Sequence, residues 1–344
     1  MATPHPQTPM SEQDLRARLD AQTNAYYSQG IPSLKQRLAT LDTLFNILKS
    51  NEHAITEAIS KDFGHRAHQE TQLAELFLCF DGIRYARKRL KKWMRPQKRS
   101  TSIWLLGSRN TVIPQPLGVV GIVVPWNYPL FLCMSPLIGA LAAGNRCMVK
   151  MAANSSHLSQ LLQGSFAKNF SADMLTIVHG AKGSDFSALP FDHLIFTGSG
   201  NSGRQVMRAA ADNLTPVTLE LGGKSPTIIA PDYSISKAAE RLLFSKCLNA
   251  GQTCVAPDYV FLPEGKVDEF VTAAKAIVSH RYANIESEDY TSIINDEAFL
   301  RLKSTLADAI DQGATSTPLV PNSEANHATR KFPPTLLTKV TGTM

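Results

Sequence analysis

The chain has 344 residues, of which 43% are hydrophobic, and a formal net charge of +6. A chain of this length can bury a sizeable core and form about two domains. Nine of its 35 Lys and Arg residues lie in one run, residues 84–99, which leaves 26 against the 29 Asp and Glu residues. Apolar residues interrupt this run, so we interpret it as the solvated face of a helix and expect no nucleic-acid partner.

Cysteine usage and the N-terminus exclude further classes of protein. The five cysteines form no C-x-x-C pair and no Cys/His cluster at metal-ligand spacing, so we expect neither a disulfide framework nor a metal site. Residues 1–19 lack the apolar core of a signal peptide, and prolines break the most apolar stretch, residues 117–143. We therefore expect a cytoplasmic protein without a membrane segment.

The first part of the chain has the pattern of helices. Residues 11–95 carry apolar side chains at spacings of three and four, with a stop at Gly64, and this predicts an all-helical layer. After Pro96, short β-like runs flank a Gly-Ser-Arg-Asn turn at residues 107–110, which predicts a hairpin. Hairpins that project in this way often join subunits, so we expect this one to contribute to a homo-oligomer.

From Leu117 onward the pattern alternates between strand and helix. Strands are predicted at residues 118–124, 147–150, 175–179 and 193–196, and helices at 129–144, 155–170 and 202–213. This alternation predicts an α/β fold with a parallel sheet. A second α/β unit begins near Pro216, with strands at 216–221, 225–230 and 259–262 and helices at 235–248 and 266–280.

A glycine-rich turn follows the strand at residues 193–196. Gly198, Gly200 and Gly203 in "FTGSGNSGRQ" fit G-x-G-x-x-G between a strand and a helix. Backbone N–H groups and a helix N-terminus in this context can hold a diphosphate, and the pattern by itself would make Glu220 the acid that binds the ribose. Glycine also serves any tight strand-to-helix turn, so both interpretations stay open at this point.

Two further side chains stand at predicted strand ends, where α/β sheets bind their ligands. Glu220 ends the apolar strand of "TPVTLELGGKSP"; it is either a half-buried general base or a solvated boundary residue. Asn127 follows the strand of "GVVGIVVPWNYP" and lies between Trp126 and a proline. Its amide is either a neutral oxyanion donor or the cap of the next helix.

The fourth stretch, "NAGQTCVAPDYV" at residues 249–260, contains Cys254. Free cysteines are among the most buried residue types, so a structural thiol is one interpretation and a nucleophile is the other. No single stretch decides between these interpretations.

Together the motifs resemble one family. "PWNYP", a strand ending in Lys150, "FTGSGNSG", "LELGGKSP" and "NAGQTC", in this order and spacing, are similar to those of the NAD(P)-dependent aldehyde dehydrogenases. "DFG" (62–64) and "KKWM" (91–94) further resemble the short-N-terminus, class 3-like branch, and most closely its coniferyl aldehyde dehydrogenases. The resemblance extends over about residues 15–344 and implies a parallel-sheet cofactor domain and an α/β catalytic domain.

The resemblance also implies a division of the chain. Residues 1–95 become the helical part of the cofactor domain, 96–116 an oligomerisation hairpin, 117–215 the NAD(P)-binding domain and 216–344 an incomplete catalytic domain. The implied activity is oxidation of a hydrophobic or aromatic aldehyde, such as coniferyl aldehyde, to its carboxylic acid. The reaction proceeds through a cysteine thiohemiacetal and a thioester.

Residue roles are carried over position by position. Cys254 becomes the nucleophile, Glu220 the general base in place of a ribose ligand, and Asn127 the oxyanion donor. The residues that the resemblance assigns to the cofactor are Trp126, Lys150, Gly198, Ser199, Gly203 and Leu221. The partners expected are a small-molecule aldehyde and, for a full-length form, a second copy of the chain in a homodimer.

Two departures from the family pattern set further expectations. Ala153 stands where relatives place an acid near the adenosine ribose, so we expect NADP to be accepted as well as NAD. The sequence ends at Met344, before the E-x-F-G-P motif of the family, and this predicts a C-terminally truncated chain. A truncated, non-catalytic nucleotide-binding relic and an acyl-CoA-forming dehydrogenase are the alternative functions; the presence of Glu220 argues against the second.

Overall fold

The computed structural model of the protein describes residues 10–344. Its residues divide into two compact units. Unit 1 comprises residues up to Ile55 together with Leu73–Glu220, and unit 2 comprises Thr56–Gln72 together with Leu221–Met344. We describe each unit by itself.

Four long helices form most of the N-terminal part of the chain: α1 (Glu12–Gln29), α2 (Leu34–Ser50), α3 (Glu52–Phe63) and α5 (Phe77–Trp93). Ser11 and Ser33 begin α1 and α2 with complete capping boxes, in which each serine side chain accepts a hydrogen bond from a backbone N–H of the first turn. α3 is followed by Gly64 at φ +80°, a conformation that L side chains rarely adopt.

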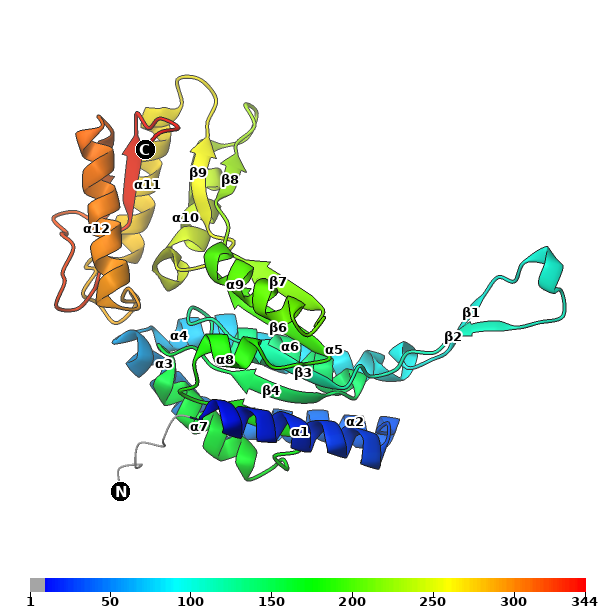
Figure 1. Ribbon diagram of the computed structural model, residues 1–344. Coiled ribbons are helices and arrows are strands. Elements are labelled where there is room, and N and C mark those ends of the chain that lie inside the picture. The colour runs from blue at the N-terminus through cyan, green and yellow to red at the C-terminus, as the bar shows by residue number, and fades with distance from the viewer. Residues whose placement is uncertain (1–9) are drawn as a thin grey trace. The chain divides into compact units, whose positions relative to one another are not determined.

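Unit 1 contains a five-stranded sheet with the order β5-β4-β3-β6-β7 (Figure 1). The strands are β3 (Val119–Val123), β4 (Arg146–Lys150), β5 (Leu175–Val178), β6 (His193–Gly198) and β7 (Val217–Leu221). The pairs β3–β4, β4–β5 and β3–β6 are parallel. β3 and β4 are almost entirely buried, which explains why their sequences are continuous apolar runs.

Helices cover this sheet: α6 (Phe131–Ala143), α7 (Ser156–Ala167), α8 (Gly183–Ser187) and α9 (Gly200–Ala211). α1, α8 and α9 contribute Leu15, Phe186 and Val206 to one hydrophobic core with strand residues such as Met148 and Leu194. α6 packs on β3 and β4 and contacts α2 and α5. The apolar surfaces of the sheet are thereby removed from water.

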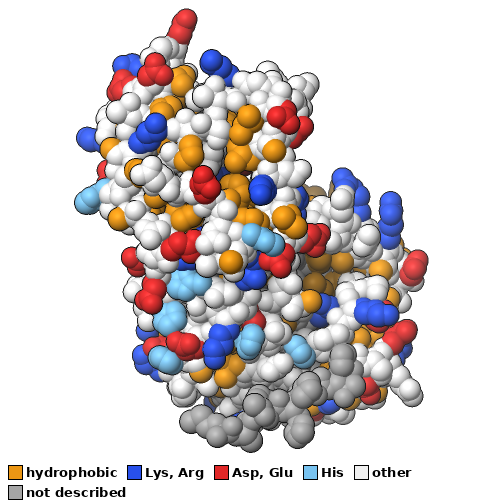
Figure 2. Space-filling model, turned by 90° about the vertical axis from the view of Figure 1, so that its left-hand side faces the viewer, with side chains coloured by type: hydrophobic (Ala, Val, Ile, Leu, Met, Phe, Trp, Pro, Cys, Tyr) orange, Lys and Arg blue, Asp and Glu red, His pale blue; other side chains and the backbone are white. Residues whose placement is uncertain are grey.

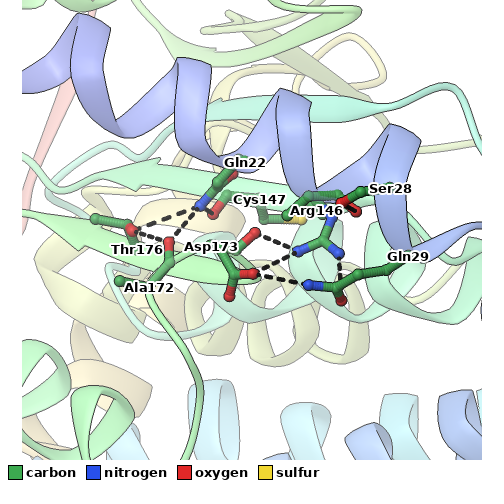
Figure 3. Close-up of polar contacts among 9 residues, drawn as sticks. Gln22, Ser28, Gln29, Arg146, Cys147, Ala172, Asp173 and Thr176 are labelled. Atoms are coloured by element: carbon green, nitrogen blue, oxygen red, sulfur yellow. Dashed lines mark hydrogen bonds and ion pairs between the residues drawn. The ribbon is translucent and has the colours of Figure 1, made fainter.

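Polar contacts fix α1 to the sheet (Figure 3). The Gln22 amide of α1 is fully buried and donates to the carbonyl oxygens of Cys147 (3.0 Å) and Ala172 (3.1 Å). About two turns further along α1, Arg146 donates to Gln29 at 2.9 Å, and Gln29 donates to the Asp173 carboxylate at 3.1 Å. These hydrogen bonds specify how α1 lies on the sheet, while the buried Gln22 Oε1 has no partner among the described residues.

The predicted hairpin is present as β1 (Gln97–Arg99) and β2 (Asn110–Val112), an antiparallel pair that projects from unit 1 (Figure 1). In α5, which precedes it, Ile83 and Leu90 are buried. Figure 2 shows acidic, basic and hydrophobic side chains interspersed over one face of the protein. The visible face therefore has no single-sign charged field.

Unit 2 is built from helices α4 (His68–Thr71), α10 (Ile235–Cys247), α11 (Val267–Arg281) and α12 (Asp296–Asp311) and from strands β8 (Ser225–Ile228), β9 (Pro257–Phe261), β10 (Thr315–Pro318) and β11 (Thr335–Thr338). β8 pairs with β9 in parallel, and β10 pairs with β11 in antiparallel. α10 and α11 form the core of the unit, with Leu243, Phe270 and Val278 buried.

The predicted fold class, an α/β protein with a parallel sheet and an N-terminal helical layer, is confirmed. The patterns did not predict α8, α12, β10 or β11. α8 has only five residues, and β10 and β11 have four residues each, which are short windows for a periodic signal. The four-domain division by function stays a prediction.

Candidate active site

The strand order of unit 1 locates a ligand-binding edge. β3 is the first strand of this sheet in chain order and lies between β4 and β6, so the connections reverse direction between β3 and β6. Open α/β sheets bind ligands at such a switch point, beyond the carboxyl ends of the strands. In the pairing register Val123 of β3 faces both Lys150 of β4 and Phe196 of β6. The predicted cofactor residues that follow these three strands therefore share one edge.

The glycine loop after β6 has the geometry of a phosphate site. Ser199 is the N-cap of α9, and its hydroxyl accepts a hydrogen bond from the Ser202 N–H at 3.2 Å. A Cβ at Gly198 would lie 2.5 Å from the Phe196 ring, so only glycine fits there. The first turn of α9 consequently presents backbone N–H groups at the switch point, where they can hold an anion.

Lys150 ends β4 at the same edge. Its ammonium is half-buried and donates to the Met151 carbonyl oxygen at 3.2 Å, and burial lowers its pKa. Ala153, three residues later, is exposed. No carboxylate side chain therefore occupies that position of the loop.

Trp126 and Asn127 follow β3 and are half-buried. The N-cap of α6 is Leu130, so the alternative in which Asn127 caps this helix is wrong. The backbone N–H groups of Leu130 and Phe131 instead donate to the fully buried carboxylate of Glu75, at 2.7 and 3.0 Å. This role of Glu75 was not predicted, because nothing in a local pattern marks a contact between residues 55 positions apart.

Glu220 and Leu221 end β7, the last strand of the sheet. Both are exposed. Of the two alternatives for Glu220, the half-buried environment is wrong for this structure, and the exposed residue at a strand end agrees with it. Its position at the carboxyl end of a strand agrees with the expectation, and its role as a base stays a prediction.

Cys254 lies in unit 2, beyond the C-terminus of α10, and is exposed. The other four cysteines of the chain, all within the described residues, are buried. Burial raises the pKa of Cys133 to about 12 and, as the largest effect, that of Cys247 to about 11. The alternative in which Cys254 is a buried structural thiol is wrong, and Cys254 is the accessible thiol of this chain.

Two glycines allow the backbone to approach closely around Cys254. A Cβ at Gly223 would lie 3.0 Å from the Cys254 carbonyl oxygen, so the "LGG" turn leaves space for the cysteine loop. Gly251 has φ +77° and closes the turn after α10. The preceding residues, Asn249 and Ala250, are also left-handed, at φ 54° and 51°.

Comparison with known proteins shows the family of the chain. Residues 9–344 match the model of the aldehyde dehydrogenase family. The chain belongs to the aldehyde dehydrogenase family. A probable coniferyl aldehyde dehydrogenase of Pseudomonas aeruginosa is 47% identical over 333 residues, which are 96% of this chain and 69% of that protein. The coniferyl aldehyde dehydrogenase of a Pseudomonas species is 41% identical, over 98% of this chain and 70% of that protein.

Solved aldehyde dehydrogenases have the same fold. The substrate-bound AldH of Staphylococcus aureus is 33% identical, with a TM-score of 0.88 over 94% of this chain and 70% of that chain. An aldehyde dehydrogenase of Mycobacterium tuberculosis in complex with NAD+ is 26% identical, with a TM-score of 0.86 over 98% of this chain and 71% of that chain. The predicted class of enzyme, an NAD(P)-dependent oxidoreductase that acts on small-molecule aldehydes, is confirmed.

Every helix in residues 10–344 of this aldehyde dehydrogenase is too short or too polar to cross a bilayer. Within the same residues, no three His, Cys, Asp or Glu side chains gather in a way that could hold a metal ion.

Proposed function

We propose that this aldehyde dehydrogenase oxidises a hydrophobic, aromatic aldehyde of the coniferyl aldehyde type to its carboxylic acid. The proposed nucleophile is Cys254, and the products are the acid, the reduced cofactor and one proton. The similarity to two coniferyl aldehyde dehydrogenases, at 47% and 41% identity, supports this class of substrate.

The observation that carries the proposal is the environment of Cys254. It is the one exposed thiol among five, and it lies on a turn whose backbone is tightly constrained. A thiolate is a strong nucleophile even at a small population, whereas a buried thiol with a raised pKa stays protonated. Cys254 is therefore the thiol that can attack a carbonyl carbon.

The first step forms a bond between Cys254 Sγ and the aldehyde carbon, and the carbonyl oxygen becomes an oxyanion. Asn127 and the Cys254 backbone N–H are the proposed donors to this oxyanion. Neutral donors fixed in advance stabilise developing charge without reorganising, and loss of one typically costs about 10² to 10³ in rate.

The switch-point edge of unit 1 fits a dinucleotide. Ser199, Gly203 and the first turn of α9 would hold the diphosphate, Lys150 would bind the adenosine ribose, and Trp126 and Leu221 would line the site. When bound, NAD(P) supplies the acceptor for the hydride of the thiohemiacetal. Because Ala153 adds no carboxylate near the ribose, a 2′-phosphate meets no repulsion there, and we propose that NADP is accepted as well as NAD.

The thioester left on Cys254 is then hydrolysed. Glu220 is the proposed base, which takes a proton from water as the water oxygen attacks the thioester carbon; the carboxylic acid and the free thiol result. Glu220→Gln should consequently spare the first turnover and slow the steady state by about 10² or more. Equal slowing of both phases would contradict this role.

Stopped-flow absorbance at 340 nm with coniferyl aldehyde and NAD tests the proposal. The wild-type chain should give a burst of reduced cofactor, and Cys254→Ser should lose it, while Cys133→Ala, which changes a buried thiol, should keep it. A burst in the Cys254→Ser variant would contradict the nucleophile. A folded wild-type chain without a burst would indicate a non-catalytic nucleotide-binding protein, and turnover only with added coenzyme A would indicate an acyl-CoA-forming enzyme.

The hairpin of unit 1 supports a further part of the proposal, that copies of this chain associate as a homo-oligomer. Its tip exposes Ile103, Trp104 and Leu106 to 70%, 88% and 81%. Apolar patches exposed to this degree commonly mark protein interfaces. Light scattering after size-exclusion chromatography should show a dimer or larger species for the wild type and a monomer for Trp104→Glu.

A further inference from the structure

We propose that Glu70 is a positioning residue for the nucleophile: its carboxylate holds the left-handed turn that presents Cys254. The inference rests on the proposed role of Cys254 and adds a residue outside every motif of the sequence analysis. Glu70 lies in α4, and both Glu70 and Cys254 belong to unit 2.

The turn before Cys254 needs an external restraint. Asn249, Ala250 and Gly251 are consecutive left-handed residues, with φ values of 54°, 51° and 77°. Glycine adopts this region freely, but alanine has no side-chain hydrogen bond with which to offset its steric cost. Residues in such conformations persist only when the surrounding structure over-determines them, and they concentrate at functional sites.

Glu70 supplies this restraint from 179 positions away in the sequence. The Asn249 backbone N–H donates to both carboxylate oxygens of Glu70, at 3.1 and 3.2 Å. The hydroxyl of Thr291 donates to Oε2 of Glu70 at 2.7 Å and so fixes the carboxylate. Thr291 and Asn249 are almost fully buried, so these donors have no ready access to water if the carboxylate is removed.

Gln252 holds the other end of the turn. Its side-chain amide donates to the Asn249 and Ser292 carbonyl oxygens, at 3.0 Å each, and its side-chain oxygen accepts from the Ile294 N–H at 2.9 Å. Glu70 and Gln252 therefore connect the turn to the same segment, residues 291–294. All four residues of that segment are buried.

Segment 291–294 is itself fixed by distant parts of unit 2. The Ser292 N–H donates to the His65 carbonyl oxygen at 3.0 Å, and the Ser292 hydroxyl donates to the Thr329 carbonyl oxygen at 2.8 Å. Arg330 donates to the carbonyl oxygens of Ile293 (2.9 Å) and Phe63 (2.6 Å). The turn is consequently anchored to a buried frame, a segment without regular secondary structure that hydrogen bonds with His65, Thr329 and Arg330 hold in place.

The frame determines where Cys254 is presented. Only Gln252 and Thr253 separate the turn from Cys254, and the Thr253 N–H donates to the Gly251 carbonyl oxygen at 2.8 Å. A change in the backbone at residues 249–251 therefore rotates the Cys254 N–H, the proposed oxyanion donor. Misplacement of a reacting group by about 1 Å can cost about 10²-fold in rate.

Hydrogen exchange monitored by mass spectrometry tests the inference directly. In Glu70→Ala, protection of the amides at residues 248–254 should fall by about tenfold or more, because their anchor is gone. Glu75→Ala is the control: it removes a carboxylate that accepts two backbone N–H groups in unit 1, whereas Glu70 accepts one N–H and one hydroxyl in unit 2. It should leave exchange at 248–254 unchanged. Unchanged protection in Glu70→Ala would overturn the inference.

Kinetics separate positioning from a general loss of structure. The burst rate constant of folded Glu70→Ala should fall by about tenfold or more with little change in the apparent affinity for NAD. Glu70→Gln should stay within about threefold of the wild type, because its amide oxygen still accepts from Asn249 and its amino group donates to Thr291. Glu57→Ala, which removes an exposed partner of His68 in unit 2, should have the same burst rate constant as the wild type.

The outcomes distinguish this inference from the proposed function. A wild-type burst rate in folded Glu70→Ala overturns the positioning role and leaves Cys254 as the nucleophile. A Glu70→Gln variant as slow as Glu70→Ala also overturns it, since the acceptor oxygen is retained. A burst that survives Cys254→Ser overturns the proposed function itself, whatever the exchange experiment shows.

Discussion

Two loops of the candidate site are held by glutamates only five positions apart, but in different ways. Glu75, in unit 1, accepts the N–H groups of Leu130 and Phe131 at the start of α6. Glu70, in unit 2, accepts the N–H of Asn249 inside a left-handed turn. A π-helical stretch, Gln72–Leu76, begins between them, and π-helical turns frequently occur at functional sites.

The two loops differ in the strain of their backbones and in the side chains that hold them. The loop after β3 leads into a regular helix, whose free N–H groups need an acceptor and whose residues keep ordinary dihedral angles. The turn after α10 has three left-handed residues in succession, and Glu70, Gln252 and Thr291 together hold it. Left-handed residues persist only where the surrounding structure holds them, and in this turn side chains from distant parts of unit 2 do so.

Replacing Asn127 should have the largest effect in unit 1. Because Leu130, not Asn127, is the N-cap of α6, Asn127→Ala should lower the burst rate by about 10² to 10³ as an oxyanion donor is lost. The midpoint of thermal unfolding is measured on the same variant. A large fall in that midpoint with an unchanged burst would show that Asn127 is structural, and the two loops would then differ in function as well as in strain.

Removing Glu75 should affect stability more than chemistry. Two N–H groups at the start of α6 would lose their acceptor, which should cost about 2 to 4 kcal/mol in the free energy of unfolding. Chemical denaturation measures this cost, and Glu75→Gln, which keeps one acceptor oxygen, should recover part of it. A loss below about 0.5 kcal/mol would mean that water replaces the carboxylate at the helix start.

Relieving the backbone strain of the turn in unit 2 should raise the free energy of unfolding, by less than the loss of Glu75 lowers it. Ala250→Gly should raise the free energy of unfolding by about 1 kcal/mol, because glycine adopts φ 51° without the steric cost of a Cβ atom. Gly30→Ala is the reverse substitution at another positive φ, 72° with ψ −172°; no atom lies within 4 Å of the added Cβ, so the backbone cost alone should lower the free energy of unfolding. Destabilisation by Ala250→Gly would show that the turn carries no strain to relieve.

Glu70 and Asp173 should contribute to the pH dependence of stability with opposite signs. This is the smallest of the predicted effects. Burial raises the pKa of Glu70 above its usual 4.5, so the folded state binds this proton more tightly and the associated stability is lost as pH rises through the raised pKa. A hydrogen bond from Ser171, with the charge of Arg146, lowers the pKa of Asp173, so its contribution is lost as pH falls.

Unfolding midpoints across pH test this contrast. The difference in midpoint between wild type and Glu70→Gln should decrease as pH rises from 4.5 through the raised pKa of Glu70. The difference between wild type and Asp173→Asn should instead decrease as pH falls below 3.8 and stay constant above it. If the difference in midpoint from the wild type changed with pH in the same direction for both variants, the two carboxylates would not contribute with opposite signs.

Local patterns in the sequence determined most of the regular structure. The apolar spacing in residues 11–95, the capping serines Ser11 and Ser33 and the apolar runs of β3 and β4 each act within a few residues of one another. The motifs likewise located the glycine loop and the one exposed cysteine. These features are readable because their causes are short-range: hydrogen bonds within a turn, and one buried face for each element.

Only the tertiary structure decided which distant residues support the site. The strand order that sets β3 beside β6, the inclusion of residues 56–72 in unit 2 and the contacts of Glu70 with Asn249 and Thr291 have no counterpart in a local pattern. The left-handed conformation of Ala250 is contrary to its own preference. Contacts across about 180 to 220 positions of the chain fix it, and their free energy exceeds the local cost only once the fold has brought those residues together.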